Sequence, residues 1–509
     1  MVPVVDLFAG PGGLSEGFEQ YCVGGTPIFR CVLSIEKERN AHKTLLLRAF
    51  FRQFDKAPAE YYEHLRGDVT LEELYKAYPE QHAQAKKQAI RLALRYANRD
   101  HIDSLIRKAL KGHRSKWVLI GGPPCQAYSL AGRVKIRADK KRTGFAKDRR
   151  HFLYKEYLHI LKVFRPPLFV MENVKGLLSS STKPNRKRKG SKKTRGKTKS
   201  GETFLRILRD FAAAGYSIHS FVKLGSGNQL APADHVINAE KYGIPQARHR
   251  VILLGVRLGL FRGYSLLRTK RRVAIESAIG DLPRLRSKIS PLSRDSFKAW
   301  SRALRRLSSL FTKDGKLRDM NGSRRILSSL PTGGPFIRAA YPNPKRSKWL
   351  RQHDDWFSDR RIKGVTLHES RGHMTSDLRR YLFASYFAHA HGVSPKISDF
   401  TSWQRPDHRN IEDNSDDTPF ADRFRVQLRG KPSTTVVSHI SKDGHYYIHY
   451  DPTQSRSLTV REAARLQTFP DNYYFEGTRT AQYGQIGNAV PPLLAKRMAK
   501  IVYRILARR

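Results

Sequence analysis

The residues best suited to chemistry begin with Cys125, in the stretch GGPPCQAYS at 121–129. The chain has only three cysteines, and this one follows two glycines and two prolines. Proline fixes φ and glycine allows unusual turns, so the stretch predicts a backbone that aims one side chain. A thiol held in this way can act as a nucleophile. The preceding run KWVLI predicts a buried strand, so Cys125 should lie on a strand-end loop, where open α/β sheets bind ligands.

A carboxyl group and two guanidinium groups follow comparable patterns. Glu172 comes directly after the apolar run LFVM, so it should lie at the same sheet edge as Cys125. In a partly apolar cleft, desolvation raises the pKa of a carboxyl group, which can then donate a proton near neutral pH. Arg248 and Arg250 alternate in QARHR, so they project from one face if a strand starts there, and paired guanidinium groups suit a phosphate or a base carbonyl. Taken alone, Glu172 could instead cap a helix, and the arginines could be ordinary surface residues.

A glycine-rich turn lies near the start of the chain. DLFAGPGGLSEGF, at residues 6–18, reads as a strand, a turn and the start of a helix, which lets a ligand approach the backbone closely. Its spacing is not G-x-G-x-x-G, which disfavours a dinucleotide with a pyrophosphate. The next strand, FRCVLSIE, ends at Glu36, where an acid can bind ribose hydroxyls. The pattern fits any nucleoside cofactor, and Glu36 alone could also be a helix cap.

The stretches that must position these groups alternate between strand-like and helix-like patterns. Apolar, β-prone runs precede the glycine-rich turn, Cys125 and Glu172, and DRRHFLYKEYLHILKVF reads as an amphipathic helix that ends before Pro166. GDVT, at 67–70, reads as another strand-end loop, and residues 71–112 read as helices. Alternation of this kind predicts an α/β protein with a parallel, doubly wound sheet.

A change of pattern near residue 275 divides the chain. Aromatic residues and arginines interleave irregularly from there, and sheet-like and helical patterns return after 430. We therefore expect a first domain over 1–275, a smaller irregular domain over 276–430, and a return segment over 431–509 that completes the first domain. The alternative for the middle part is a long helical insertion with no ligand of its own.

The charge of the chain points to a polyanionic partner. The 96 Lys and Arg residues exceed the 44 Asp and Glu residues and leave a formal net charge of +52. Nucleic acid is the first candidate for the partner, and an anionic membrane surface is the second. The basic, low-complexity segment 181–201 predicts a disordered loop that binds phosphate, although a nuclear localisation signal would look similar.

Other bulk features exclude some classes of protein. The sequence contains no run of about 18 or more apolar residues that would suit a transmembrane helix. Its start, MVPVVDLF, reads as a strand rather than a signal peptide. Three cysteines form a sparse, odd set that is typical of a reducing interior, so we expect a cytoplasmic protein without a membrane partner. No C-x-x-C pair occurs, and we expect no metal centre.

Six blocks of the chain, in order, resemble the cytosine-C5 DNA methyltransferase family. They are DLFAGPGGLSEGF, GGPPCQAYS, ENV, YGIPQARHR, TVREAARLQTFP and QIGNAVPP, and they run from residue 6 to 492. One block would be suggestive, but six in one order are very specific. The wide gap before TVREAARLQTFP matches the place where the family holds its target-recognition domain. The resemblance implies a Rossmann-like, S-adenosylmethionine-dependent methyltransferase fold with a mostly parallel sheet, plus a smaller, irregular target-recognition domain.

The resemblance also implies roles for individual residues. Cys125 would attack C6 of a flipped-out cytosine, with Glu172 at N3 and the amino edge of the base and Arg250 near its carbonyl. Phe8 would pack on the adenine of S-adenosylmethionine and Asp68, in GDVT, would contact the adenine amino group. The full set implied for the cofactor is Phe8, Gly10, Pro11, Gly13, Glu36, Asp68, Pro124, Leu153, Asn488 and Ala489. The implied catalytic set is Cys125, Glu172, Arg248 and Arg250, in which Arg248 supports the site, and the set implied for DNA is Gln126, Ser129 and Arg150.

The main hypothesis is therefore a monomeric enzyme that methylates cytosine in a specific double-stranded DNA sequence. It would be the modification half of a restriction–modification system, whose cognate endonuclease need not form a stable complex with it, or a solitary bacterial enzyme. Two alternatives stay open: a catalytically silent DNA-binding regulator, and a tRNA cytosine-C5 methyltransferase of the same superfamily. The intact set of Cys125, Glu172 and Arg250 argues against the first, and the large recognition domain favours duplex DNA over tRNA. A nicotinamide oxidoreductase is a remote alternative.

Overall fold

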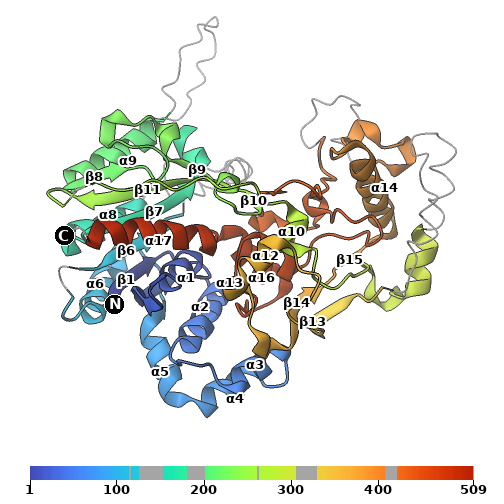
Figure 1. Cartoon of the computed structure of the whole chain (residues 1–509), viewed down its shortest axis with the longest axis horizontal. Coiled ribbons are helices and arrows are strands. Elements are labelled where there is room, and N and C mark those ends of the chain that lie inside the picture. The colour runs from blue at the N-terminus through green and yellow to red at the C-terminus, as the bar shows by residue number, and fades with distance from the viewer. Residues whose placement is uncertain are drawn as a thin grey trace, which may run out of the picture.

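The computed structural model describes residues 1–113, 116–124, 153–179, 201–260, 263–304, 330–406 and 421–507. Its centre is an eight-stranded sheet with the strand order β5-β4-β1-β6-β7-β11-β8, and β9 pairs with β11 (Figure 1). The first five of these strands run parallel, whereas β11 is antiparallel to β7, β8 and β9, so the expected mostly parallel sheet is confirmed. The strands are β1 (Val2–Leu7), β4 (Phe29–Glu36), β5 (Ala89–Arg91), β6 (Val118–Gly121), β7 (Leu168–Val174), β8 (Tyr216–His219), β9 (Val236–Asn238) and β11 (His249–Arg257).

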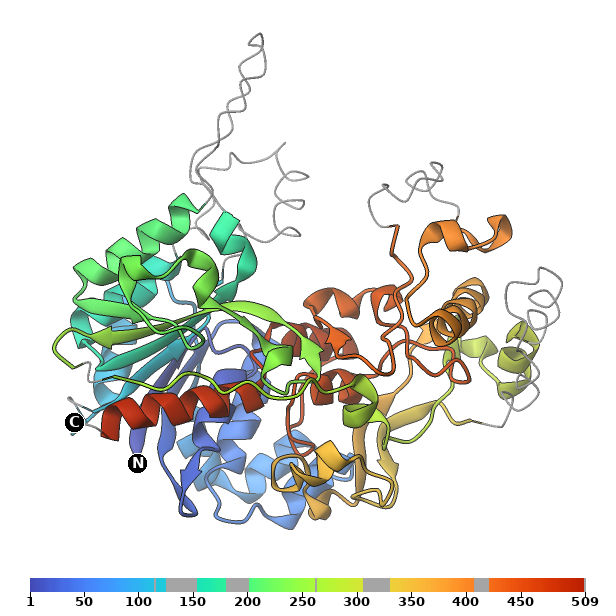
Figure 2. The same ribbon diagram turned by 45° about the horizontal axis from the view of Figure 1, so that its top comes forward.

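Helices cover both faces of this sheet, which explains why its central strands read as continuous apolar runs. Every residue of β1 is buried, and β6 is buried throughout. One face packs on α1 (Gly13–Glu19) and α17 (Pro492–Ala507). The other packs on α6 (Arg99–Ala109), α8 (Leu153–Phe164) and α9 (Glu202–Ala213). Figure 2 shows α17 lying along its face of the sheet.

A helical region follows β4 and precedes β5. It comprises α2 (Arg39–Phe51), α3 (Ala59–Arg66), α4 (Leu71–Ala77) and α5 (Pro79–Gln88), which share a hydrophobic cluster. The interpretation of GDVT as a strand-end loop is wrong, because this stretch joins α3 to α4. Gly67 ends α3 in the left-handed conformation with φ 88°, and the Thr70 side chain accepts a hydrogen bond from the Glu73 N–H to cap α4. The third strand of the sheet, β5, instead lies within the stretch that reads as helical.

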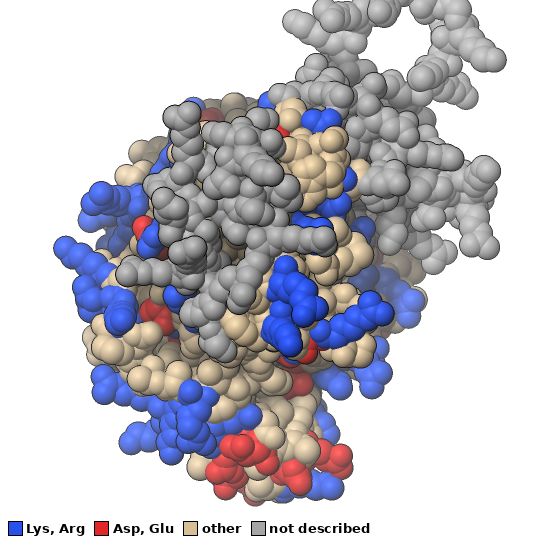
Figure 3. All heavy atoms as spheres, turned by 90° about the vertical axis from the view of Figure 1, so that its right-hand side faces the viewer, with Lys and Arg blue, Asp and Glu red and all other residues tan. Residues whose placement is uncertain are grey.

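The described residues of 276–430 form short elements and one helix of 17 residues. They include β12 (Lys288–Ile289), β13 (Gly333–Arg338), β14 (Gly364–Glu369), β15 (Gly372–His373), α12 (Lys348–Arg351), α13 (Asp354–Phe357) and α14 (Thr375–His391). Figure 3 views the molecule from the side of this region: Lys and Arg side chains are spread widely over that face, and acidic side chains gather at its lower end, at the level where Figure 1 draws α4. A shared cluster joins Val365 and Leu367 to Leu458 and Phe469, so this region packs directly on the return segment. The limits 1–275, 276–430 and 431–509 stay a prediction.

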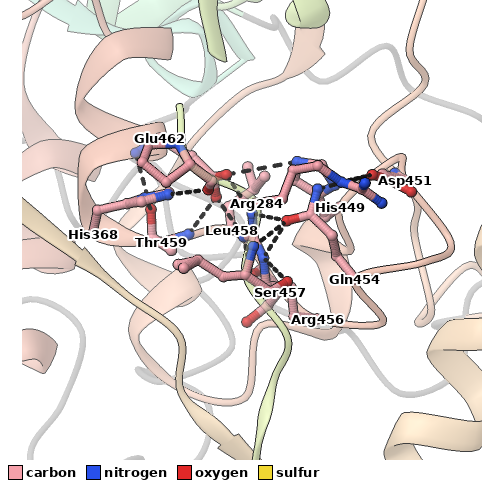
Figure 4. A network of polar contacts seen from close by, with 12 residues as sticks. Arg284, His368, His449, Asp451, Gln454, Arg456, Ser457, Leu458, Thr459 and Glu462 are labelled. Carbon is pink, nitrogen blue, oxygen red and sulfur yellow. Dashed lines mark hydrogen bonds and ion pairs between the residues drawn. The ribbon is translucent and has the colours of Figure 1, made fainter. Parts of the chain in front are cut away.

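A buried polar network ties the same two regions together (Figure 4). Glu462, in α15 (Val460–Leu466), accepts hydrogen bonds from Nη1 and Nη2 of Arg456 at 2.7 and 2.6 Å. Burial alone would raise the pKa of Glu462, but Arg456 holds it well below its ordinary value. His368, from β14, contacts Thr459 Oγ1 at 2.9 Å and Pro283 O at 2.7 Å through its two ring nitrogens. Because buried charges and polar groups need partners, this network fixes β14 relative to α15.

Candidate active site

The carboxyl ends of four neighbouring strands form one row at an edge of the sheet. Strand pairing places Leu7 beside Ile35 and Gly121, and Gly121 beside Met171. The residues that directly follow these four in the chain therefore also lie side by side at the edge of the sheet. They are Phe8, Glu36, Gly122 and Glu172. The sheet therefore brings together the glycine-rich turn, the acid after β4, the start of the GGPPC loop and the acid of ENV.

Glu172 is paired with Arg250 across β7 and β11. Arg250 lies opposite Val174, and Ile252 lies opposite Glu172, so the arginine and the acid share a face and meet diagonally. Arg250 Nε lies 3.0 Å from Glu172 Oε1, and the side chains are 15% and 12% exposed. Burial lowers the pKa of Arg250, and the neighbouring carboxylate opposes this effect. The pair therefore presents an oriented carboxylate in a mostly dehydrated site.

The loop that leads to Cys125 begins against this carboxylate. A Cβ placed on Gly122 would lie 3.1 Å from Glu172 Oε2, so the absence of a side chain makes room for the acid. Asn173 Nδ2 donates a hydrogen bond to Pro123 O at 3.3 Å, which ties the loop to β7. The half-buried Pro124 is the last described residue here. Cys125, Gln126, Ser129 and Arg150 lie outside the described residues, as does the basic segment 181–201 except for its last residue.

The glycine-rich turn is held from two sides. Phe8 has φ 55° and Gly10 has φ 57°, so the chain turns sharply just after β1. Gly10 N donates to Glu36 Oε2 at 2.9 Å, and Glu38 N donates to Glu36 Oε1 at 2.7 Å. The Tyr473 hydroxyl donates to Pro11 O from the other side. Each carboxylate oxygen of Glu36 keeps acceptor capacity for a further donor.

The GNAV loop, residues 487–490 of the block QIGNAVPP, packs directly on the start of α1. A Cβ on Gly13 would lie 2.3 Å from Val490 O and 3.2 Å from the Cβ of Ala489, so only glycine fits there. Asn488 ends α16 (Arg479–Asn488) with an exposed side chain, and Ala489 is buried. Leu153, at the first described turn of α8, is half-buried. The structure therefore places Gly13 and Ala489 in contact and Asn488 beside them in the chain.

Arg248 has surroundings that differ from those expected. It lies between β10 (Gln246–Ala247) and β11 rather than within one strand, and its side chain is fully buried. Its Nη1 donates to Val436 O at 2.8 Å and its Nη2 donates to Gly487 O at 3.1 Å. The expected pairing with Arg250 on a phosphate or base carbonyl is therefore wrong. Arg248 instead fixes the backbone just before Asn488.

Asp68 also departs from its expected place. It follows α3, and its carboxylate accepts a hydrogen bond from Arg66 Nε at 2.9 Å. Because β5 provides the strand beside β4, no strand end carries Asp68 toward the row of residues at the sheet edge. The strand-end position expected for Asp68 is therefore wrong, and its assignment to the adenine amino group stays a prediction.

Asp6 is a buried polar residue that pattern reading did not single out. It is 0% exposed within β1, opposite Ser34 of β4, and Ser15 lowers its pKa from the side of the glycine-rich turn. Burial raises the pKa of Asp6 to about 7. Its signal in the sequence was a single acid within the otherwise apolar run VPVVDL.

Two structural features bear on other classes of site. Within the described ranges, no group of three or more His, Cys, Asp or Glu side chains could hold a metal ion. No helix in the described part of the chain is both long and apolar enough to cross a membrane.

Comparison with known proteins adds to this geometry. The family model described as C-5 cytosine-specific DNA methylase matches residues 96–504. The type II methyltransferase M.Bpa9945I of Bacillus paralicheniformis is 31% identical over 99% of this chain and 99% of its own length. The DNA (cytosine-5-)-methyltransferase M.ApeKI of Aeropyrum pernix is 28% identical over 76% of this chain and 81% of its own length. A crystal structure described as a DNA modification methyltransferase encoded within a prophage (E. coli) covers 100% of both chains with 18% identity and a TM-score of 0.50, a likeness of fold.

Proposed function

The chain belongs to the C-5 cytosine-specific DNA methylase family and methylates cytosine at C5 in DNA, and from this premise we propose that Cys125 is its nucleophile and that its target is one short duplex sequence. The observation that carries the proposal is the Glu172–Arg250 pair beside the start of the GGPPC loop. Glu172 and the loop follow strands that end in one row, and Arg250 lies at the start of the antiparallel β11, so the three share one edge of the sheet, where a substrate pocket is expected.

Each group has a chemical task in the proposed reaction. The Cys125 thiolate adds to C6 of the cytosine, a C6–S bond forms, and C5 becomes electron-rich like an enamine carbon. Glu172 holds a proton at the N3 edge of the base, and Arg250 orients Glu172 and lies near the base carbonyl. After C5 gains the methyl group, it loses its proton to a base in the site, and the electron pair released at C5 expels the thiolate from C6. A free thiol is only a few per cent ionised at pH 7, so nearby positive charge must lower its pKa.

The residues at the sheet edge fit S-adenosylmethionine as the methyl donor. Glu36 lies where an acid can accept hydrogen bonds from ribose hydroxyls, and a Cβ on Gly10 would meet no atom within 4 Å, which leaves room for a ligand near the backbone. Phe8, Gly10, Pro11, Gly13, Pro124, Leu153, Asn488 and Ala489 complete the proposed set. When bound, S-adenosylmethionine supplies an electrophilic methyl group on sulfur.

The DNA substrate must present its target cytosine outside the helix. The reacting face of a stacked base is not accessible, so the nucleotide has to flip into the pocket at a cost of a few kcal/mol. The net charge of +52 supplies favourable contacts with phosphate groups that offset this cost. Residues 276–430 are the proposed target-recognition domain, and Gln126, Ser129 and Arg150 are proposed DNA contacts.

The relatives suggest the biological setting. M.Bpa9945I is named as a type II methyltransferase, and this chain spans its whole length. We assign the protein to the modification half of a restriction–modification system or to a solitary methyltransferase. In either case it works as a monomer, in the cytoplasm at the nucleoid, with no stable endonuclease complex.

The test of the nucleophile uses two cysteine variants. Cys125→Ser should abolish methylation of a target duplex while its affinity for DNA stays within a few fold of the wild type. Cys22→Ser is the matched control, because Cys22 is exposed on a β-hairpin outside the row of site residues, and this variant should keep full activity. Turnover by Cys125→Ser would overturn the assignment. Binding of DNA without methylation by the wild type would favour the silent regulator, and methylation of tRNA alone would favour the RNA enzyme.

A further inference from the structure

A line of positive charge lies on the outer side of α17, away from the row of site residues. Arg497, Lys500 and Arg504 are three and four residues apart, so they share one face of the helix. The segment after β11 runs beside them (Figure 2): Arg504 Nη1 lies 3.2 Å from Ser265 Oγ. We call the set of Lys270, Arg497, Lys500 and Arg504 the basic strip.

Lys270 belongs to this set by direct proximity. A Cβ on Gly243 would lie 3.3 Å from Lys270 Cβ and 3.5 Å from Arg497 Nη1, so both cations flank the same glycine. The backbone N–H of Lys270 donates to Lys241 O at 2.8 Å, which fixes the segment in place. The neighbouring Arg268, Arg271 and Arg272 are exposed and extend the positive charge along the chain.

The cations of the basic strip are not neutralised within the described structure. No carboxylate of the described residues lies within ion-pair distance of Lys270, Arg497, Lys500 or Arg504. Arg497 Nη1 is buried without a hydrogen-bond partner there. The charge of Arg497 lowers the pKa of Lys270, and burial and Lys500 lower it further. Burial lowers the pKa of Arg497 to about 10.

The other titratable groups around the basic strip add to this imbalance. Burial lowers the pKa of His353, and the positive charges of Arg497, Lys270 and Lys496 act in the same direction. The nearby acids Asp355 and Glu16 raise the pKa of Lys496, which lies next to Arg497 in the chain. Like charges packed together without an anion are destabilising, and a buried charged donor without a partner costs further free energy. The arrangement is therefore expected to favour an anion at its surface.

We propose that the basic strip binds the phosphate backbone of duplex DNA beyond the segment that presents the target cytosine. A line of cations over seven residues of helix extends about 10 Å, which matches several successive phosphates better than one small anion. DNA is the polyanion that this enzyme meets, so the inference rests on the DNA substrate. Since α17 begins near the GNAV loop and runs along the face of the sheet, these phosphates lie outside the catalytic edge.

The test compares two triple variants of the full-length protein. The first carries Lys270→Gln, Arg497→Gln and Lys500→Gln. The control carries Lys56→Gln, Lys86→Gln and Lys87→Gln, which remove the same charge from exposed positions in the helical region after β4. The affinity for a duplex of about 40 base pairs without target sites is measured against salt concentration. The first variant should reduce the slope of log K against log salt by about 0.9 for each phosphate that it no longer binds, and the control should reduce it much less.

Three outcomes decide the inference. Equal slopes for both variants would overturn it. Unchanged DNA binding together with a loss of binding to vesicles of anionic phospholipid would overturn it in favour of a membrane surface. Protection of Lys270 and Lys500 from acylation by the same duplex, in the wild type, supports it even if the variant folds poorly. At saturating DNA, the first variant should methylate a short target duplex at a rate within about twofold of the wild-type rate. A failure of the catalytic proposal would therefore be seen separately from a failure of this inference.

Discussion

Replacing Asp6 with asparagine should make the protein more stable above neutral pH. Asp6 is buried in β1, and burial outweighs the opposing effect of Ser15 and raises the pKa of Asp6 from 3.8 to about 7. The folded state therefore holds a proton on Asp6 that the unfolded state releases at lower pH. The stability that this proton provides is fully present below about pH 4, and it is lost as the pH rises through about 7.

The size of this effect follows from the change in pKa. A change from 3.8 to about 7 corresponds to about 4 kcal/mol between the protonated and ionised forms, taken as an upper value. Asparagine carries no charge at any pH, so the variant should lack this part of the pH dependence. Its amide keeps the need for hydrogen bonds, so little gain is expected at pH 5.

Urea unfolding at pH 5, 7 and 9 measures the effect directly. The free energy of unfolding of the wild type should fall between pH 5 and 9 by up to about 3 kcal/mol more than that of Asp6→Asn, because about two of the pKa units lie above pH 5. Asp68→Asn serves as the control, because Asp68 is exposed between α3 and α4. Parallel curves for the wild type and Asp6→Asn would refute the reasoning, as would a variant that is less stable at pH 9.

Five further predictions concern the site and its surroundings. Glu172→Gln and Arg250→Ala should each lower the single-turnover methylation rate by about 100-fold or more, with DNA affinity changed only a few fold; near-normal rates would remove both from the chemistry. Gly13→Ala should lower the free energy of unfolding by about 1–3 kcal/mol and weaken cofactor binding, because its Cβ would meet Val490 O at 2.3 Å. Gly10→Ala meets no atom within 4 Å, so in calorimetry it should cost only about 1 kcal/mol for its left-handed conformation. Asp68→Asn should leave the affinity for S-adenosylmethionine unchanged, and a tenfold loss would support its assignment to the adenine amino group. Deletion of 185–199 should reduce the salt dependence of DNA binding, and an unchanged slope would show that this segment binds no phosphate.

The elements around the sheet edge could be predicted because their signals are local. Buried parallel strands read as short apolar runs, so β1, β6 and β7 are evident from the sequence. The residues that end such strands must meet at one edge, so the sequence alone predicts that Glu36 and Glu172 lie along it. The proximity of Gly122 to Glu172 could not be predicted in the same way, because it depends on the register between β6 and β7.

The errors arose where distant parts of the chain decide the outcome. The partners of Arg248 are carbonyls of Val436 and Gly487, 188 and 239 residues away, and no local pattern reports them. GDVT has the composition of a strand-end turn, but Gly67 and Thr70 act there as the end of one helix and the cap of the next. Most described elements of the region 276–430 are short strands or single helical turns, so their periodicity was too weak to define them; the 17-residue helix α14 is an exception.

Bisulfite sequencing of plasmid DNA from methylation-free cells that express this chain tests the central claim most directly. The account predicts protected cytosines within one short sequence motif, and complete conversion when the cells express Cys125→Ser instead. Uniform conversion in cells that contain folded wild-type protein would contradict the assignment of sequence-specific cytosine-C5 methylation of DNA.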